Sequence, residues 1–285
     1  MEFVKHLLPL LLTGSLALMI IAAGIASSRG DFAYVLARPA LLGRAMVAIV
    51  VIPVLIAVVI IALCPISHSA KAGIFLMAIS PVAPLMPGKA LKFGGHGAYV
   101  YGLQAAGAVL ALLFVPTLGE LGSKFYDVDA HFPIGVVARN IFVGLVIPLG
   151  IGLVLGRLVL RKVSPALPRT LMIIANLLLI LAFLPILASL LPDIGALIGD
   201  GTILAMAVVV GTALIGGHLL GGPDPANRAT LAFSASMRHP GIALALAGAN
   251  HADKAITAAV LLFLLVGLVV LIPYQVALKR KAAPA

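Results

Sequence analysis

Charged residues are scarce in this chain. Only 10% of its 285 residues are charged, whereas a soluble domain usually carries about 25%. So few charges leave too little polar surface to coat a water-facing globule, and 62% of the residues are hydrophobic. The apolar residues form long blocks that recur to the C-terminus. One membrane domain over residues 1–285 therefore explains the chain better than a soluble domain with a tail.

Two further features, the single cysteine and the placement of the basic residues, exclude other classes of protein. Cys64 is the only cysteine, so a disulfide framework or a cysteine metal site is impossible. The net charge of +10 is typical of nucleic-acid binders, but those proteins need clustered basic residues on a solvated surface with aromatics between them. Here the basic residues sit between or inside apolar blocks. The sequence therefore predicts a lipid bilayer as partner, with no nucleic acid and no cofactor.

The predicted fold is all-α, a polytopic bundle of nine transmembrane helices. A helix needs roughly 20 mostly apolar residues to cross the hydrocarbon core. Nine segments meet this length, and the third and eighth are interrupted. The predicted spans are 6–27, 43–64, 73–94, 97–117, 132–156, 167–191, 201–220, 226–249 and 255–278.

The basic residues predict that the N-terminus is outside and the C-terminus is cytoplasmic, because positive residues in short loops stay inside. The first span also fits a signal peptide. Cleavage would move the basic tail to the outside, so we keep the span. The inner side carries Arg29, Arg38, Arg44, Arg157, Arg161, Lys162, Arg169, Arg228, Lys279, Arg280 and Lys281, against Lys5, Lys71, Lys124 and Lys254 outside.

The third and eighth spans are predicted to be broken helices. Pro81, Pro84 and Pro87 remove amide donors and clash with preceding carbonyls, so no continuous helix survives there. Pro87-Gly88 recurs as Pro240-Gly241, an offset of 153 residues (240 − 87), with alanine, leucine and a later glycine at matching positions. The loop count makes the two copies run in opposite senses. This pattern indicates an inverted repeat, approximately 6–117 and 132–278.

Two matched breaks point to a binding site. Unsatisfied backbone groups cannot face lipid, so broken helices survive only where they are buried or line an aqueous cavity. A single proline kink is common and harmless, but two in corresponding positions indicate a midplane site. The predicted helix-break residues are Pro84, Pro87, Gly88, Pro240 and Gly241.

The charges inside the spans are all basic. Lys89 and Arg238 lie within two residues of the two Pro-Gly breaks. A buried cation without a carboxylate costs at least a few kcal/mol. Carbonyls freed at the breaks could offset part of this cost and a bound anion the rest. We therefore expect a small organic anion near Lys89 and Arg238, whereas Lys92 and Arg139 are expected to reach the membrane surfaces.

Four polar residues complete the candidate site. His239 is either a hydrogen-bonding pocket residue or a proton carrier, because histidine titrates easily. The other three either contact the substrate or bridge helices. They are Ser234, Ser236 and Gln104.

At these residues the chain resembles the bile acid/sodium symporter family and its bacterial relatives. Gly30-Asp31-Phe32, Arg38-Pro39 and Ile52-Pro53 resemble its second and third helices, and residues 80–88 and 234–247 resemble its two broken helices. The resemblance implies a core of spans two to four and seven to nine, a panel of the remaining spans with the cavity between them, and a bacterial inner membrane. The family's first helix is missing, which fits nine spans.

The departures from the family concern sodium. The resemblance implies sodium ligands from a Ser-Asn pair in the first broken helix and from a Glu and a Gln in the second. Here Met86-Pro87 replaces the pair, Ser234 replaces the glutamate and Arg238 replaces the glutamine. Our hypothesis is that Lys89 and Arg238 permanently supply the charge that sodium supplies in relatives. Coupling would then be to protons or to a second anion.

Three alternatives remain. The chain could be a true sodium symporter with other ligands, such as main-chain carbonyls. It could be an intramembrane enzyme, but no span carries an acidic pair or a hydrolase motif. It could be a channel or scaffold, which the inverted repeat disfavours. The identity of the substrate, the direction of transport and the oligomeric state are left open by the sequence.

Overall fold

The computed structural model describes residues 2–125, 134–159 and 166–282, and the regular structure of these residues is helical. The start of the predicted fifth span at Phe132, and the predicted inner charges Arg161 and Lys162, lie outside the described residues.

Six of the described helices are long and apolar enough to cross a membrane. They correspond to the second, fourth, fifth, sixth, seventh and ninth predicted spans. The second is α3 (Pro39–Met46), η1 (Val47–Val51) and α4 (Ile52–Leu63); the fifth is α8 (Ile134–Ile141), η2 (Phe142–Val146), α9 (Ile147–Val154) and η3 (Leu155–Val159); the others are α7 (Gly97–Phe125), α10 (Ala166–Ser189), α12 (Thr202–Leu220) and α15 (Lys254–Ala282).

A seventh candidate is the first predicted span. It forms α1 (Glu2–Ala26), which is followed by α2 (Arg29–Leu36) after a bend of 90°. Ser28 and Asp31 form a capping box at the start of α2, which fixes the new helix after the bend.

The third and eighth predicted spans are each two short helices. The third is α5 (His68–Ile79) followed by α6 (Met86–Lys92). The eighth is α13 (Pro225–Ser236) followed by α14 (Pro240–Ala249). Each second half has a proline in its first turn, Pro87 in α6 and Pro240 in α14, where the missing N–H is not needed. A further short helix, α11 (Leu191–Leu197), follows α10 and was not predicted.

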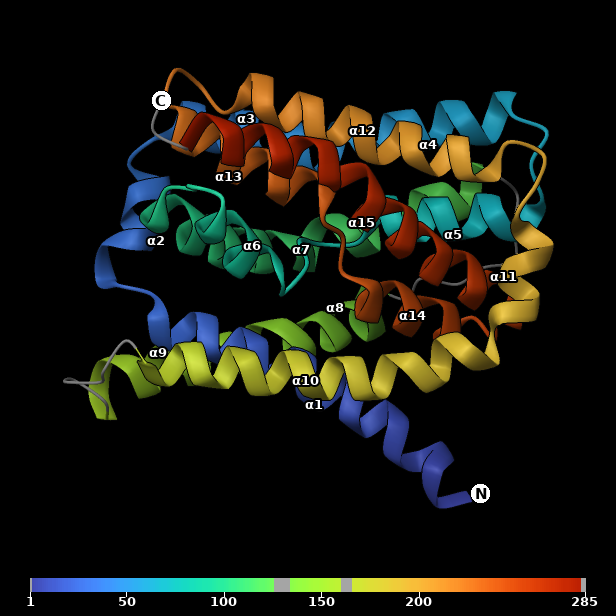
Figure 1. Cartoon of the computed structure of the whole chain (residues 1–285), viewed down its shortest axis with the longest axis horizontal. Helices are drawn as coiled ribbons and strands as arrows, with labels where there is room; N and C mark the ends of the chain where they lie inside the picture. Colours follow the sequence, from blue (N-terminus) through green and yellow to red (C-terminus); the bar gives the residue numbers. More distant parts are fainter. Residues whose placement is uncertain (1, 126–133, 160–165, 283–285) are drawn as a thin grey trace.

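The helices form two groups (Figure 1). In the first, which we call the panel, α1 packs along both α9 and α10, and α8 precedes α9. In the second, the core, α12 packs against α4, α13 and α15, while α5 packs against α15. Helix α14 contacts α1 and α8 as well as α5 and α15, so it lies where the two groups meet.

Glycines allow the backbones within each group to approach closely. A Cβ added at Gly152 of α9 would lie 2.3 Å from the carbonyl oxygen of Ile21 in α1. One added at Gly217 of α12 would lie 2.5 Å from the carbonyl oxygen of Leu231 in α13. Because lipid provides no hydrophobic force between helices, such small-residue contacts are a main source of packing energy in a membrane.

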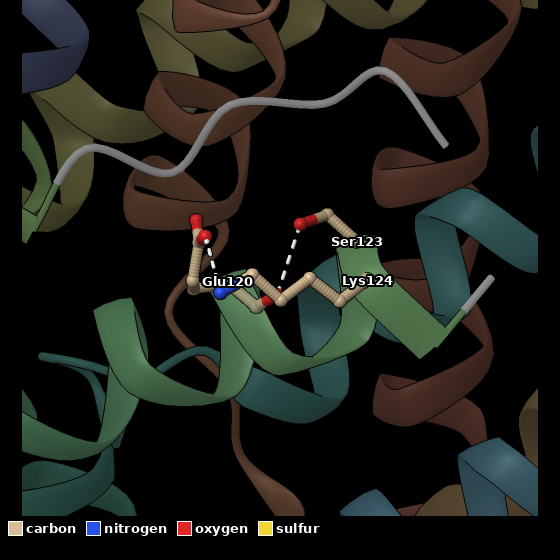
Figure 2. A network of polar contacts seen from close by, with 3 residues as sticks. All are labelled: Glu120, Ser123 and Lys124. Carbon is tan, nitrogen blue, oxygen red and sulfur yellow. Dashed lines mark hydrogen bonds and ion pairs between the residues drawn. The ribbon is translucent and has the colours of Figure 1, made fainter. Parts of the chain in front are cut away.

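The far end of α7 is polar (Figure 2). The Lys124 ammonium pairs with the Glu120 carboxylate at 3.2 Å, one turn away, and the Ser123 hydroxyl donates to the Glu120 carbonyl at 3.0 Å. Such a solvated pair contributes about 0.3–0.5 kcal/mol. Its position at a helix end agrees with a helix that leaves the membrane there.

We expect Gly217→Ala to destabilise the protein, because its methyl group would push α13 away from α12. The matched control is Gly211→Ala on the same helix, where no atom lies within 4 Å of an added Cβ. There the higher helix propensity of alanine should leave stability unchanged or raised by up to about 1 kcal/mol. The measurement is thermal unfolding in detergent, followed by gel filtration. Equal melting temperatures for the two variants would contradict the close contact.

Candidate functional site

Two short breaks in helices form the centre of the molecule. The first covers residues 80–85 between α5 and α6, and the second covers residues 237–239 between α13 and α14. Pro81 and Pro84 have no N–H and cannot continue α5, which explains the first break. The second ends at Pro240, and the residue before a proline is pushed away from helical backbone angles.

The two breaks cross and hydrogen-bond to each other. Ala83 donates its N–H to the carbonyl of Met237 at 3.0 Å, and His239 donates its N–H to the carbonyl of Pro81 at 2.9 Å. Together they form an isolated antiparallel β-bridge. Each break thus gives the other break hydrogen-bond partners for its backbone, which the membrane interior does not offer.

Arg238 lies at this crossing and is 3% exposed. Its guanidinium donates from Nη1 to the carbonyl of Ser80 at 3.1 Å and from Nη2 to the carbonyl of Ile49 in η1. The side chain therefore joins three segments: η1, the first break and the second break. Its charge is met by backbone dipoles and, among the residues that the structure describes, not by a carboxylate.

Both acceptor carbonyls lie outside regular α-helical turns. Ile49 is in the π-helical segment η1, and Ser80 is the C-cap residue of α5 with extended backbone angles. The residues four positions after Ile49 and Ser80 are Pro53 and Pro84, which have no N–H to donate. The guanidinium of Arg238 donates to both carbonyls.

His239 caps the second half-helix. Its Nδ1 accepts from the N–H of Ile242 at 3.3 Å, at the start of α14. Its Nε2 is buried and has no hydrogen-bond partner among the described residues. Gly241 makes room for the ring, because an added Cβ would lie 3.1 Å from the imidazole and 2.7 Å from Leu16 of α1. The glycine of the second Pro-Gly break is therefore a close-packing residue.

The two serines bond to their own helix, and the remaining polar candidate is buried. Ser234 donates its hydroxyl to the carbonyl of Thr230 at 2.8 Å, and Ser236 donates to that of Ala232 at 2.7 Å, each one turn back along α13. Gln104 of α7 is 2% exposed, and its Oε1 has no partner within the described part of the chain. None of the three presents a free hydroxyl or carboxylate for chemistry.

A large cavity of about 1090 Å³ lies between the panel and the core. It is lined by α1, the first break, α6, α7 and α10. Its polar side chains are basic or neutral and include Lys89 and Lys92 of α6, Tyr101 of α7, and Arg169 and Asn176 of α10; no carboxylate is among its described lining residues. A cavity with positive charge on both walls favours an anion.

A smaller cavity of about 270 Å³ lies beside the crossing. Its walls come mainly from α1, α10, α14 and α15, with the two breaks and single residues of α5 and α13, and they are almost wholly apolar. The polar exceptions are Asn176, Ser236 and Arg238. Leu85 and Asn176 line both cavities, so the two adjoin at the start of α6.

The structure separates residues that the sequence grouped together. Lys89 lines the large cavity, whereas Arg238 is buried in the crossing and borders the small one. Arg139 is exposed on α8. Lys92, expected only to snorkel, also lines the large cavity.

Three lining residues were missed by sequence reasoning: Tyr101, Arg169 and Asn176. Arg169 was counted with the loop charges. Its place one residue after Pro168, in the first turn of α10, was a usable signal, because a proline near a helix start fixes where the helix begins. Asn176 is a polar residue within the apolar helix α10, and a polar residue in such a span is a signal for a cavity or a helix contact.

The comparisons with known proteins identify the family. The model of the Sodium Bile acid symporter family matches residues 13–192. The chain belongs to this family. The match contains the first break and ends before α13, so it does not include the second break. No curated protein matches the chain. Membership indicates a membrane transporter of the bile acid/sodium symporter type, in agreement with the apolar helices.

The residues at the family's sodium positions do not fit a sodium ion. A hard cation needs several oxygen ligands, preferably with a carboxylate. Met86 is buried and brings no oxygen, Pro87 brings none from its side chain, and Ser234 donates to its own helix. Arg238 places a positive charge on the two acceptor carbonyls themselves. Among the described residues, no cluster of three His, Cys, Asp or Glu side chains is placed to hold a metal.

We expect Arg238→Met to lower stability, because two buried carbonyls would lose their donor. Each unsatisfied group costs about 1–3 kcal/mol, so the melting temperature should fall by several degrees or more. Arg139→Met is the control, since Arg139 is an exposed arginine on α8. A melting temperature for Arg238→Met at or above that of the wild type would show that the desolvation of the cation outweighs its bonds.

Proposed function

We propose that the chain is a secondary active transporter of small organic anions that works by alternating access without sodium. The observation that carries the proposal is the position of Arg238, which holds a fixed positive charge on the carbonyls of Ser80 and Ile49 at the crossing. Family membership supports transport, and the basic large cavity supports an anionic substrate.

We propose nine membrane crossings, namely the six long helices, α1 and the two broken pairs α5–α6 and α13–α14. The broken pairs are related by the sequence repeat, with repeat units of approximately 6–117 and 132–278. An outside N-terminus, a cytoplasmic C-terminus and an inner-membrane location follow from the charge bias and the family resemblance. In this orientation the large cavity opens to the cytoplasm, because it lies at the end of α1 and the start of α10.

Lys89 is the proposed contact for the anion's charge. It is half-buried, whereas Lys92 and Arg169 are exposed at the same cavity. The exposed pair would attract an anion towards the cavity, and Lys89 would bind it one turn from the first break. His239, Ser234, Ser236 and Gln104 lie away from the lining of the large cavity, so they would not contact an anion bound there, whereas Ser236 lines the small cavity.

Arg238 takes over the role proposed for sodium. In a sodium-coupled relative, a bound cation would neutralise carbonyls at the crossing and join the broken helices. A guanidinium attached to the second break would do the same without leaving the protein. Transport would then need another source of energy, either a proton or a second anion.

The main alternative is a sodium-coupled symporter of bile-acid-type anions, which the family name favours. A second alternative, an intramembrane enzyme, lacks support, because the basic cavity contains no carboxylate or cysteine among its described lining residues. The two transport hypotheses predict different responses of anion binding to sodium.

We expect Lys89→Gln to weaken anion binding about tenfold to hundredfold, because a charged hydrogen bond to the substrate is worth roughly 1.5–3 kcal/mol. The panel of anions is a branched-chain keto acid, pantothenate, cholate and an alkyl sulfonate. Binding is measured by the rise in melting temperature. Lys124→Gln is the control, since Lys124 pairs with Glu120 at the far end of α7 (Figure 2). Equal loss in both variants would indicate a non-specific charge effect.

We expect anions to stabilise the wild type equally in sodium and potassium salts, because Arg238 already fills the cation position. Arg238→Gln should be less stable in potassium and should regain stability in sodium, since the two freed carbonyls and the new amide oxygen are hard ligands. The measurement is again thermal unfolding, with choline as a third cation. If the wild type responds to anions only in sodium, the chain is a sodium symporter.

A further inference from the structure

The small cavity has a chemistry opposite to that of the large one. Its walls are apolar side chains, mainly from four helices, among them Phe183, Phe263 and Leu264. Ser236 and Arg238 border it, but their hydroxyl and guanidinium already bond to backbone carbonyls. The cavity therefore offers little to a polar group and suits a hydrocarbon.

The two cavities adjoin within reach of one small molecule. Leu85 lines both, and Lys89 follows it by four residues at the start of α6. Four residues of helix span about 6 Å. A carboxylate bound to Lys89 is thus about one helical turn from the mouth of the small cavity, and an attached carbon chain can enter it past Leu85.

The volume of the small cavity limits the size of that chain. A water molecule occupies about 30 Å³ in the liquid, and a methylene group is of similar size. A cavity of about 270 Å³ therefore takes roughly nine methylene groups. A linear or sparsely branched chain of this size fits, whereas a fused-ring body of twice the volume does not.

We propose that the substrates are amphipathic monoanions with one carboxylate or sulfonate and a slender aliphatic chain, with the head at Lys89 and the chain in the small cavity. This inference rests on the proposed function and names its substrate class. The large cavity that adjoins the small one is lined by basic side chains. The occupant of the small cavity is therefore the tail of an anion and not the chain of a neutral lipid.

The test is a chain-length series of straight-chain carboxylates, from butanoate to octadecanoate, bound to the protein in nanodiscs and measured by calorimetry. Burial of each methylene should tighten binding about threefold to fourfold. The gain should stop several carbons beyond decanoate, because the first few carbons span the turn between Lys89 and the cavity mouth and roughly nine methylene groups then fill the cavity. An alkylamine of equal length should not bind, because Lys89 repels it.

The matched variant is Gly267→Leu on α15, which lines the small cavity. The nearest atom to a Cβ added there is Val210 Cγ2 at 3.8 Å, an ordinary contact, so the first carbon of a side chain fits, and we expect the branches of a leucine to occupy part of the cavity. The plateau should then come about three carbons earlier, because packed interiors leave no spare room. Gly211→Leu is the control: it lies outside the lining, has no atom within 4 Å of its added Cβ, and should bind like the wild type.

The outcomes separate two kinds of failure. If anions of the panel bind but affinity does not depend on chain length, the proposal for the small cavity is wrong and the transport proposal stands. The same conclusion follows if Gly267→Leu keeps the wild-type plateau, or if amines bind as well as carboxylates, which would indicate occupation by lipid chains. If no organic anion binds or moves in counterflow, the proposed function itself fails.

Discussion

The crossing of the two broken helices is the constraint on which the rest of the structure depends. A helix break exposes backbone groups, and hydrocarbon offers them no partner. Here the breaks exchange two backbone hydrogen bonds, and Arg238 serves two further carbonyls. Because α6 begins at this crossing, Lys89 arrives at the wall of the large cavity. The chemistry of the cavity therefore follows from where the helices are forced to stop.

Much of the architecture could be predicted from the sequence. Apolar length located six long helices, and prolines located both breaks, because these signals act within one segment. The partners of Arg238 could not be predicted, since Ser80 and Ile49 lie 158 and 189 residues away and meet it only through packing. The roles of Ser234 and Ser236 were within reach, because serine in a helix often bonds to the carbonyl one turn back.

The two basic residues beside the breaks, Arg238 and Lys89, have different surroundings, which suit them to different roles. Arg238 is enclosed, and a planar guanidinium with several fixed donors suits two carbonyls held at set directions. Lys89 is half-buried on a cavity wall, where its flexible chain lets the ammonium reach several positions. The glycine contacts hold each group together, because they let α1 pack closely on α9 in the panel and α12 pack closely on α13 in the core. The panel and the core are thus each tightly packed, with the cavities between them.

The pairing of Arg238 with the carbonyls of Ser80 and Ile49 has an evolutionary consequence. The arginine and its two acceptors lie in three different segments of the chain, yet one side chain satisfies both acceptors. A descendant that loses the arginine is left with two buried carbonyls without their donor. A replacement at position 238 is therefore tolerated only together with a second change that supplies a new donor to each carbonyl.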